Sequence, residues 1–253
     1  MAMDRRRFTV LTGGALASFA FGSACEGTSF LAQAGSGRLK TRPKAGGTTS
    51  ARGKSALRLG GTRDAILIMP SVIPTTPLPL IVMLHGAGGS ADRFLQRFGT
   101  LPEEAGLPML FVDSRGLTWD GIRGGFGPDV DFLDGALEKV FGMVVVDPTR
   151  LALGGFSDGA TYALSLGLVN GDLFPRIVAF SPGFLIYGEV HGKPRVFISH
   201  GTVDDILQID RSSRVIVPEL KKRGYDVTFR EFEGGHEVPR AIAEQGFTFV
   251  RAS

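Results

Sequence analysis

The chain has 253 residues, of which 43% are hydrophobic and 21% are charged, a composition typical of a globular protein with one principal domain. Its net charge of +3 comes from the N-terminal region, because residues 1–63 hold eleven Lys and Arg against two acidic residues and the remainder is net acidic. This distribution predicts no nucleic-acid partner. A single cysteine, Cys25, excludes an intramolecular disulfide, and the sequence has no Cys/His cluster that could hold zinc.

Residues 1–34 have the pattern of an export signal. A charged segment with twin arginines, residues 4–8, precedes an apolar run over residues 9–24 that is too short to span a bilayer. The pattern resembles a twin-arginine signal, which implies export to the periplasm, the cell envelope or the medium. We expect cleavage after Ala34, and the alternative is lipid attachment at Cys25. Membrane contact is expected only in that second case.

Residues 35–61 are rich in Gly, Ser, Thr, Arg and Lys and contain few large apolar side chains. Such a segment buries too little apolar surface to offset the entropy lost on ordering. The composition therefore predicts a disordered basic linker, followed by a catalytic domain over residues 62–253.

Beyond residue 61, short apolar runs alternate with longer amphipathic ones, which predicts a mostly parallel sheet flanked by helices. Several of the apolar runs are nearly continuous, as expected for strands that are covered on both faces. The predicted strands are 64–69, 79–84, 108–113, 150–155, 176–180, 195–199 and 226–232. The predicted helices are 91–105, 129–142, 158–169, 208–223 and 238–250.

The segment Gly155-Phe156-Ser157-Asp158-Gly159 lies between a predicted strand and an Ala/Leu-rich helix. In this context a G-x-S-x-G pattern is typical of a nucleophilic serine in a tight turn, because only glycines let the strand and helix pack close to it. The alternative is an ordinary turn between a strand and a helix. We predict that Ser157 is the nucleophile.

The segment His85-Gly86-Ala87-Gly88-Gly89 directly follows another predicted strand. A glycine-rich loop there can direct backbone N–H groups at a developing oxyanion. The segment resembles the HGGG-type loop of lipases and esterases. We expect the N–H groups of Ala87 and Asp158 to be the two donors and His85 to hold the loop.

Of four histidines, only His236 lies after the serine and after a candidate acid, at the end of the last predicted strand. It is the predicted general base, with an ordinary surface histidine as the alternative. Two adjacent aspartates follow the preceding strand in His200-Gly201-Thr202-Val203-Asp204-Asp205. The resemblance to esterases extends to this H-G-T-x-D segment and implies that Asp204 orients His236, while Asp205 is expected to be a surface or helix-start charge.

Taken together, the motifs across about residues 78–250 resemble the phospholipase/carboxylesterase branch of the α/β-hydrolases, which includes acyl-protein thioesterases. They also resemble the group of secreted polyhydroxybutyrate depolymerases and feruloyl esterases. The resemblance implies an α/β-hydrolase fold, with a mostly parallel central sheet and helices on both faces. Only about a dozen residues separate Gly183 from the strand at 195, so no large cap domain is expected.

Trp119, in a glycine-rich stretch after a predicted strand, is either a wall of the substrate pocket or part of the core. We expect it in the pocket, together with Gly86 and Gly88. Asp129 and Asp131 have no accompanying ligands and are expected to cap a helix, so no metal and no cofactor is predicted.

The predicted activity is that of a serine carboxylic-ester hydrolase that acts through an acyl-enzyme on a small-molecule or polymeric ester. The alternatives are a serine peptidase or thioesterase on the same fold, or a binding protein without catalysis. The sequence does not indicate an oligomeric state.

Overall fold

The computed structural model describes residues 35–252. The predicted export signal, with Cys25 and the cleavage site at Ala34, lies outside the described residues and stays a prediction. Within residues 35–252, no helix is long and apolar enough to cross a membrane.

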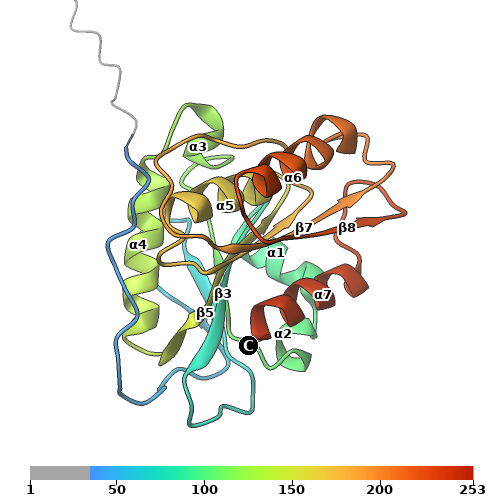
Figure 1. The fold of residues 1–253 in the computed structure, drawn as a ribbon. Coiled ribbons are helices and arrows are strands. Elements are labelled where there is room, and N and C mark those ends of the chain that lie inside the picture. Colours follow the sequence, from blue (N-terminus) through green and yellow to red (C-terminus); the bar gives the residue numbers. More distant parts are fainter. Residues whose placement is uncertain (1–34, 253) are drawn as a thin grey trace, which may run out of the picture. The chain divides into compact units, whose positions relative to one another are not determined.

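Eight strands form one sheet in the order β1-β2-β4-β3-β5-β6-β7-β8 (Figure 1). The β1–β2 and β2–β4 pairs are antiparallel and all the other pairs are parallel, so the predicted mostly parallel sheet is confirmed. All seven predicted strands are present, and β1 is an additional one. The strands are β1 (Lys54–Ala56), β2 (Ala65–Ile68), β3 (Leu78–Leu84), β4 (Met109–Val112), β5 (Val146–Phe156), β6 (Arg176–Phe180), β7 (Arg195–Gly201) and β8 (Val227–Phe232).

The helices follow the predicted order with two interruptions. The segment expected as one helix over 91–105 breaks at Gly99, and the one expected over 208–223 begins with a separate 3₁₀ turn, Ile209–Arg211. A short helix, α3, was not predicted. The helices are α1 (Ala91–Phe98), α2 (Leu101–Glu104), α3 (Asp120–Arg123), α4 (Pro128–Phe141), α5 (Asp158–Val169), α6 (Ser213–Lys222) and α7 (Arg240–Arg251).

Side-chain alternation along the strands divides the core between the two faces of the sheet. Leu80, Val82 and Leu84 of β3 pack with α4 and α5, whereas Ile81 and Met83 pack with α1 and α7. Successive residues of a strand point to opposite faces, so a continuous apolar run is buried on both. Helices therefore cover both faces of the sheet, as predicted (Figure 1).

The strand order places the site-bearing loops at one edge of the sheet. Strand β3 has β4 on one side and β5 on the other, so the chain reverses its direction of winding there. In open α/β sheets, such a switch point opens a crevice at the carboxyl ends of the strands. The loops after β3, β5, β7 and β8 all begin at this edge. Residues 181–194, which link β6 to β7, contain no helix or strand, so no cap is built there.

The prediction of a disordered linker over residues 35–61 is wrong. The apolar side chains of this segment are few, but Leu39 and Leu57 are buried in the core. Strand β1 pairs with β2, and the guanidinium of Arg38 lies 2.7 Å from the carboxylate of Asp172. Main-chain groups of the segment also find partners, since Asn170 accepts from the N–H of Leu39 and donates to the carbonyl of Gly37. Two well-placed leucines and satisfied backbone groups are enough to order a polar segment.

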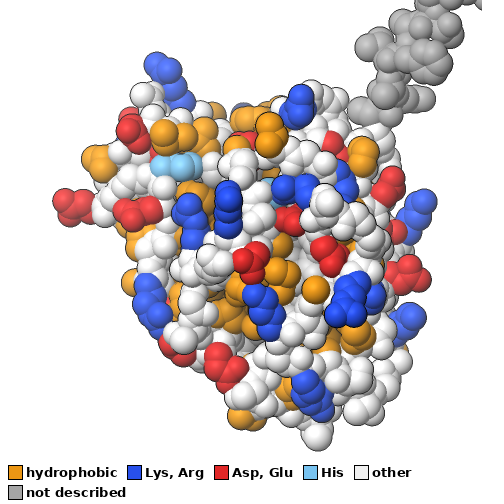
Figure 2. All heavy atoms as spheres, turned by 180° about the vertical axis from the view of Figure 1, so that it is seen from behind, with side chains coloured by type: hydrophobic (Ala, Val, Ile, Leu, Met, Phe, Trp, Pro, Cys, Tyr) orange, Lys and Arg blue, Asp and Glu red, His pale blue; other side chains and the backbone are white. Residues whose placement is uncertain are grey.

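Charges of both signs are interspersed over the face of the molecule seen in Figure 2. Several of them form ion pairs, such as Lys54 with Asp92 at 2.9 Å and Arg195 with Asp226 at 3.0 Å. Exposed pairs of this kind contribute little to stability. The stability of the domain therefore depends mainly on its apolar core.

Packing of the 35–61 segment can be tested with Leu57→Ala. Because the Leu57 side chain is only 1% exposed, its truncation should lower the free energy of unfolding by about 2–5 kcal/mol. Val72→Ala is the control, since Val72 is 80% exposed and its truncation should change the free energy little. Urea denaturation followed by circular dichroism measures both. Equal, small effects would mean that the segment is not packed in solution.

Candidate active site

The Ser157 turn is shaped by glycines that cannot be replaced. Ser157 joins β5 to α5 with φ 58° and ψ −124°, in the left-handed half of backbone space that a serine rarely adopts. A Cβ at Gly159 would lie 2.1 Å from the carbonyl oxygen of Leu84, and one at Gly155 would lie 2.4 Å from the carbonyl oxygen of Gly159. Both glycines are thus required for close backbone contact, as the sequence analysis predicted.

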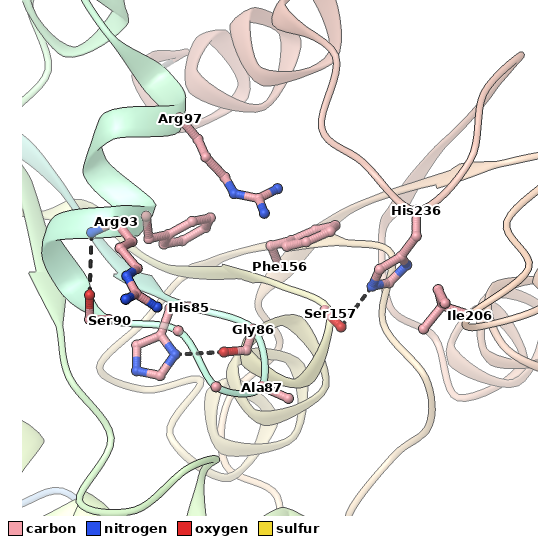
Figure 3. Close-up of a pocket in the computed structure, with 13 residues that line it drawn as sticks. His85, Gly86, Ala87, Ser90, Arg93, Arg97, Phe156, Ser157, Ile206 and His236 are labelled. Atoms are coloured by element: carbon pink, nitrogen blue, oxygen red, sulfur yellow. Dashed lines mark hydrogen bonds between the residues drawn. The ribbon is translucent and has the colours of Figure 1, made fainter.

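Ser157, His236 and Asp204 form a continuous line of hydrogen bonds. His236 Nδ1 lies 2.7 Å from Asp204 Oδ2, and His236 Nε2 lies 2.8 Å from Ser157 Oγ. A carboxylate only accepts, so Nδ1 carries the proton and donates to Asp204. Nε2 is then the free base that accepts from the Ser157 hydroxyl (Figure 3). The structure therefore brings together the three residues predicted to act on the substrate.

The Asp204 carboxylate is held in one orientation by donors on both oxygens. Besides His236, the N–H groups of Ile206 and Leu207 donate to Oδ1 at 3.0 and 2.8 Å. Burial by itself raises the pKa of Asp204, but the hydrogen bonds from His236 and from these two N–H groups outweigh it and keep the pKa below its ordinary value. Asp204 is consequently a charged partner for His236. Asp205 is exposed.

His200 also contacts the Asp204 carboxylate, at the same oxygen as His236. Its Nε2 lies 2.6 Å from the carbonyl oxygen of Leu207 and 3.1 Å from Asp204 Oδ2, and its Nδ1 lies 2.7 Å from the hydroxyl of Ser213. Burial lowers the pKa of His200, so the ring is neutral, with Nε2–H as donor and Nδ1 as acceptor. This agrees with the structural role predicted for His200.

The two predicted oxyanion donors are free. Asp158 is the first residue of α5, where an N–H has no acceptor within the helix, and its carboxylate is engaged by the Thr118 hydroxyl at 2.6 Å. Within residues 35–252 no backbone acceptor lies on the N–H of Ala87 or of Asp158. Both residues adjoin Ser157, Asp158 in the chain and Ala87 in the pocket (Figure 3). Free N–H groups beside a nucleophile are the arrangement that stabilises an oxyanion.

Gly86 and Gly88 shape the loop that carries Ala87. A Cβ at Gly86 would lie 3.2 Å from the Cβ of Ser157, so a larger residue would crowd the Ser157 side chain. Gly88 has φ 65° and its N–H donates to the carbonyl of Leu117 at 2.7 Å. These contacts hold the loop in place, and the N–H of Ala87 has no backbone acceptor among the described residues. Both glycines line the pocket.

His85 holds this loop as a neutral ring. Its Nε2 faces two donors, the N–H of Ser114 at 3.1 Å and the Arg63 guanidinium at 3.1 Å, so Nε2 carries no proton. Nδ1–H then donates to the carbonyl of Gly86 at 2.7 Å. Burial lowers the pKa of His85, and the Arg63 charge adds to this effect.

The prediction that Trp119 forms a pocket wall is wrong. The side chain is fully buried, stacks on Tyr162 with ring centroids 5.2 Å apart, and is not among the pocket residues. Its Nε1–H donates to the carbonyl of His85 at 2.8 Å. An indole in the core with its N–H satisfied is the usual state of a buried tryptophan. Trp119 thus supports the oxyanion loop from beneath and does not touch the space above Ser157.

Asp129 has a structural role other than the predicted capping of its own helix. Its carboxylate accepts from the N–H groups of Arg115 and, at 2.7 Å, Asp120, while Asp120 accepts from the N–H of Asp129 at 2.7 Å. These reciprocal bonds join the start of α3 to the start of α4. No group of His, Cys, Asp and Glu among the described residues is arranged to hold a metal ion.

The pocket above Ser157 has a volume of about 410 Å³. Sequence reasoning missed five other residues that line this pocket, which are Arg93, Phe94 and Arg97 of α1 together with Phe156 and Ile206. In Figure 3, Arg93 and Arg97 lie on one side of Ser157, and His236 and Ile206 lie on the other side. The spacing of the two arginines on the helix after the oxyanion loop was a signal that could have found them.

This geometry can carry out acyl transfer. It offers a hydroxyl in contact with a base, a base fixed by a carboxylate, two free N–H donors and an open space for a substrate.

A family model described as Phospholipase/Carboxylesterase matches residues 130–252. A protein of Nocardia uniformis subsp. tsuyamanensis named "Putative esterase NocK" is 29% identical over 151 residues, which are 56% of this chain and 43% of that protein. The chain thus spans less than half the length of this curated relative.

Solved structures share the fold. The esterase PE8 superposes with a TM-score of 0.59 at 21% identity, covering 73% of this chain and 96% of that one. The Bacillus cereus carboxylesterase gives a TM-score of 0.59 at 19% identity, covering 77% and 96%. At these identities the likeness shows the fold, which is that of the α/β-hydrolases.

The buried neutral histidines predict how stability depends on pH. The pKa values of His85 and His200 are lowered from 6.5 in the folded protein, so below about pH 6.5 the unfolded chain binds more protons than the folded chain. The free energy of unfolding should be highest above about pH 6.5. It should fall as the pH drops toward the lowered pKa values that the two histidines have in the folded protein. Urea denaturation across this range measures the loss, and His85→Gln should make it shallower. An unchanged slope in that variant would show that His85 does not contribute.

Proposed function

We propose that the chain, which has the α/β-hydrolase fold and matches the phospholipase/carboxylesterase family over residues 130–252, is a serine carboxylic-ester hydrolase that acts through an acyl-enzyme on Ser157. The observation that carries the proposal is the hydrogen-bonded line from Asp204 through His236 to Ser157, at 2.7 and 2.8 Å, which ends in an open pocket.

In the first step Ser157 Oγ attacks the ester carbonyl and its proton passes to His236 Nε2. The carbonyl oxygen gains negative charge and accepts hydrogen bonds from the N–H groups of Ala87 and Asp158. The tetrahedral intermediate then collapses, the C–O bond to the alcohol breaks, and His236 returns the proton to the leaving oxygen. Asp204 stabilises the imidazolium that exists between these two transfers.

In the second step a water molecule attacks the acyl-enzyme and His236 again takes the proton. Breaking the bond to Ser157 releases the carboxylic acid and restores the hydroxyl. The absence of helices and strands from residues 181–194 supports an accessible site, which suits small or polymeric esters. A peptidase, a thioesterase or a binding protein without catalysis remain alternatives that the experiments below distinguish.

Comparing variants of the adjacent Asp204 and Asp205 can identify the carboxylate that orients His236. Asp204→Asn should lower kcat roughly 10³–10⁴-fold, because an amide no longer fixes the Nδ1–H form of His236. Asp205→Asn is the matched control, since the Asp205 side chain is exposed. It should retain wild-type turnover of a p-nitrophenyl ester. The reverse ranking in folded variants would transfer the role to Asp205.

The nucleophile can be identified by covalent labelling. A fluorophosphonate should label the protein at Ser157, and Ser157→Ala should abolish labelling and lower ester hydrolysis about 10⁵-fold. Ser55→Ala, on strand β1, is the control and should be labelled normally.

Rates on matched ester, thioester and amide substrates then rank the alternative activities. A folded Ser157→Ala protein that hydrolyses esters at the wild-type rate would refute the mechanism. A wild-type protein that hydrolyses none of the three substrates would favour a binding protein.

A further inference from the structure

The only charged side chains among the pocket residues, apart from histidines, are the guanidinium groups of Arg93 and Arg97. The two residues are one helical turn apart on α1, so they lie on the same face of the helix. No Asp or Glu of the described part of the chain lines this pocket. The wall formed by α1 is therefore cationic.

Neither arginine has an ion pair or a side-chain hydrogen bond within residues 35–252. Asp92, the one acidic residue of α1, is engaged by Lys54 at 2.9 Å and by Gln96 at 2.6 Å. The carboxylates of the next helix are also occupied, since Glu104 pairs with Arg240 and Glu103 accepts from the N–H of Ser71 at 2.8 Å. On the face seen in Figure 2, charges are interspersed with opposite charges. The positive charge of Arg93 and Arg97 is consequently available to a ligand.

Phe156 fixes the direction of one of the two arginines. The Arg97 guanidinium carbon lies 5.4 Å from the ring centroid of Phe156, which precedes the nucleophile and is itself 4.7 Å from the His236 ring. A guanidinium over an aromatic face is held by a cation–π contact. Arg97 is thereby directed over the floor of the pocket and not away into solvent (Figure 3).

The catalytic geometry assigns this wall to the acyl side of the substrate. The leaving oxygen must lie within reach of His236 Nε2 to receive its proton, so the alcohol portion occupies the His236 side. The acyl chain then extends away from His236, toward α1. Arg93 and Arg97 lie on that side of Ser157 (Figure 3).

We propose that Arg93 and Arg97 bind a carboxylate at the far end of the acyl chain, which makes half-esters of dicarboxylic acids the substrate class of this site. The inference rests on the proposed esterase function. A paired guanidinium wall recognises a carboxylate by charge and by its forked donors. Because the wall is solvent-exposed, its effect is moderate and sensitive to salt.

The test compares length-matched substrates in a pH-stat. Monoethyl adipate is paired with ethyl hexanoate and monoethyl suberate with ethyl octanoate, so that each pair differs only in a terminal carboxylate. The Arg93→Gln/Arg97→Gln variant should lose roughly tenfold in kcat/KM on the half-esters, about threefold for each exposed charge pair. The loss should appear in KM with kcat little changed, because remote binding is equal in ground and transition states. Rates on the neutral esters should change less than about twofold.

Four controls separate carboxylate binding from structural damage and test the acyl-side assignment. Arg93→Lys/Arg97→Lys keeps the charge but not the forked donors and should retain part of the half-ester activity. Added NaCl should reduce the wild-type activity on half-esters without affecting neutral esters. Lys221→Gln/Lys222→Gln removes the same charge from the end of α6, outside the pocket, and should behave as wild type. A third substrate pair, 6-acetoxyhexanoate against hexyl acetate, carries the carboxylate on the alcohol and should not respond to the arginines.

Each outcome has a distinct meaning. Equal losses on neutral and charged esters, or no loss on either, would overturn the inference while the Ser157-dependent hydrolysis of ethyl hexanoate upholds the proposed function. A response confined to the acetoxyhexanoate pair would overturn the acyl-side assignment. Failure of the wild-type protein to hydrolyse any of these esters would refute the proposed function, and the inference with it.

Discussion

The contact between the end of β3 and the turn from β5 to α5 is the constraint on which the rest of the site depends. A Cβ at Gly159 would lie only 2.1 Å from the carbonyl oxygen of Leu84. The start of α5 is therefore in direct backbone contact with the end of β3. That contact is possible only with glycine. Because the oxyanion loop starts one residue after Leu84, the same contact sets the loop beside Ser157. One backbone contact thus positions both Ser157, the proposed nucleophile, and the N–H groups proposed to stabilise the oxyanion.

The strained backbone of Ser157 is stabilised by the strand pairing around it. A residue held at φ 58° and ψ −124° costs on the order of 1–3 kcal/mol. The N–H of Ser157 donates to the carbonyl of Phe180 at 3.0 Å, which continues the β5–β6 pairing through the turn, and Thr161 donates to the carbonyl of Ser157 at 2.9 Å. The turn is thereby held from both sides. In this strained conformation the Ser157 hydroxyl points at His236, and the N–H of Asp158 has no backbone acceptor in the part of the chain that the structure describes.

The sequence predicted those features that are determined by local pattern, and it failed where distant contacts decide. The strands and the glycines of the Ser157 turn depend on neighbouring residues, and all seven predicted strands are present. Residues 35–61 were expected to be disordered because their composition is polar, yet Leu57 is buried by a sheet that composition cannot reveal. Trp119 shows the same limit, since only the position of the His85 carbonyl determines that the indole points into the core. The arginine wall was missed because charges on a helix are usually solvated.

Hydrogen-bond environment distinguishes the three histidines near the site better than their order in the chain does. His85 presents its free nitrogen to two fixed donors, and His200 is enclosed between a carbonyl and a hydroxyl, so neither ring can exchange a proton without breaking buried hydrogen bonds. His236 differs because its side chain is 14% exposed in an open pocket while that of His200 is fully buried, and its free nitrogen accepts from the Ser157 hydroxyl. Its other nitrogen faces a carboxylate that stabilises the charged ring once the proton has been transferred. Of these three histidines, His236 is therefore the one placed to exchange a proton with a bound substrate, as the proposed general base must.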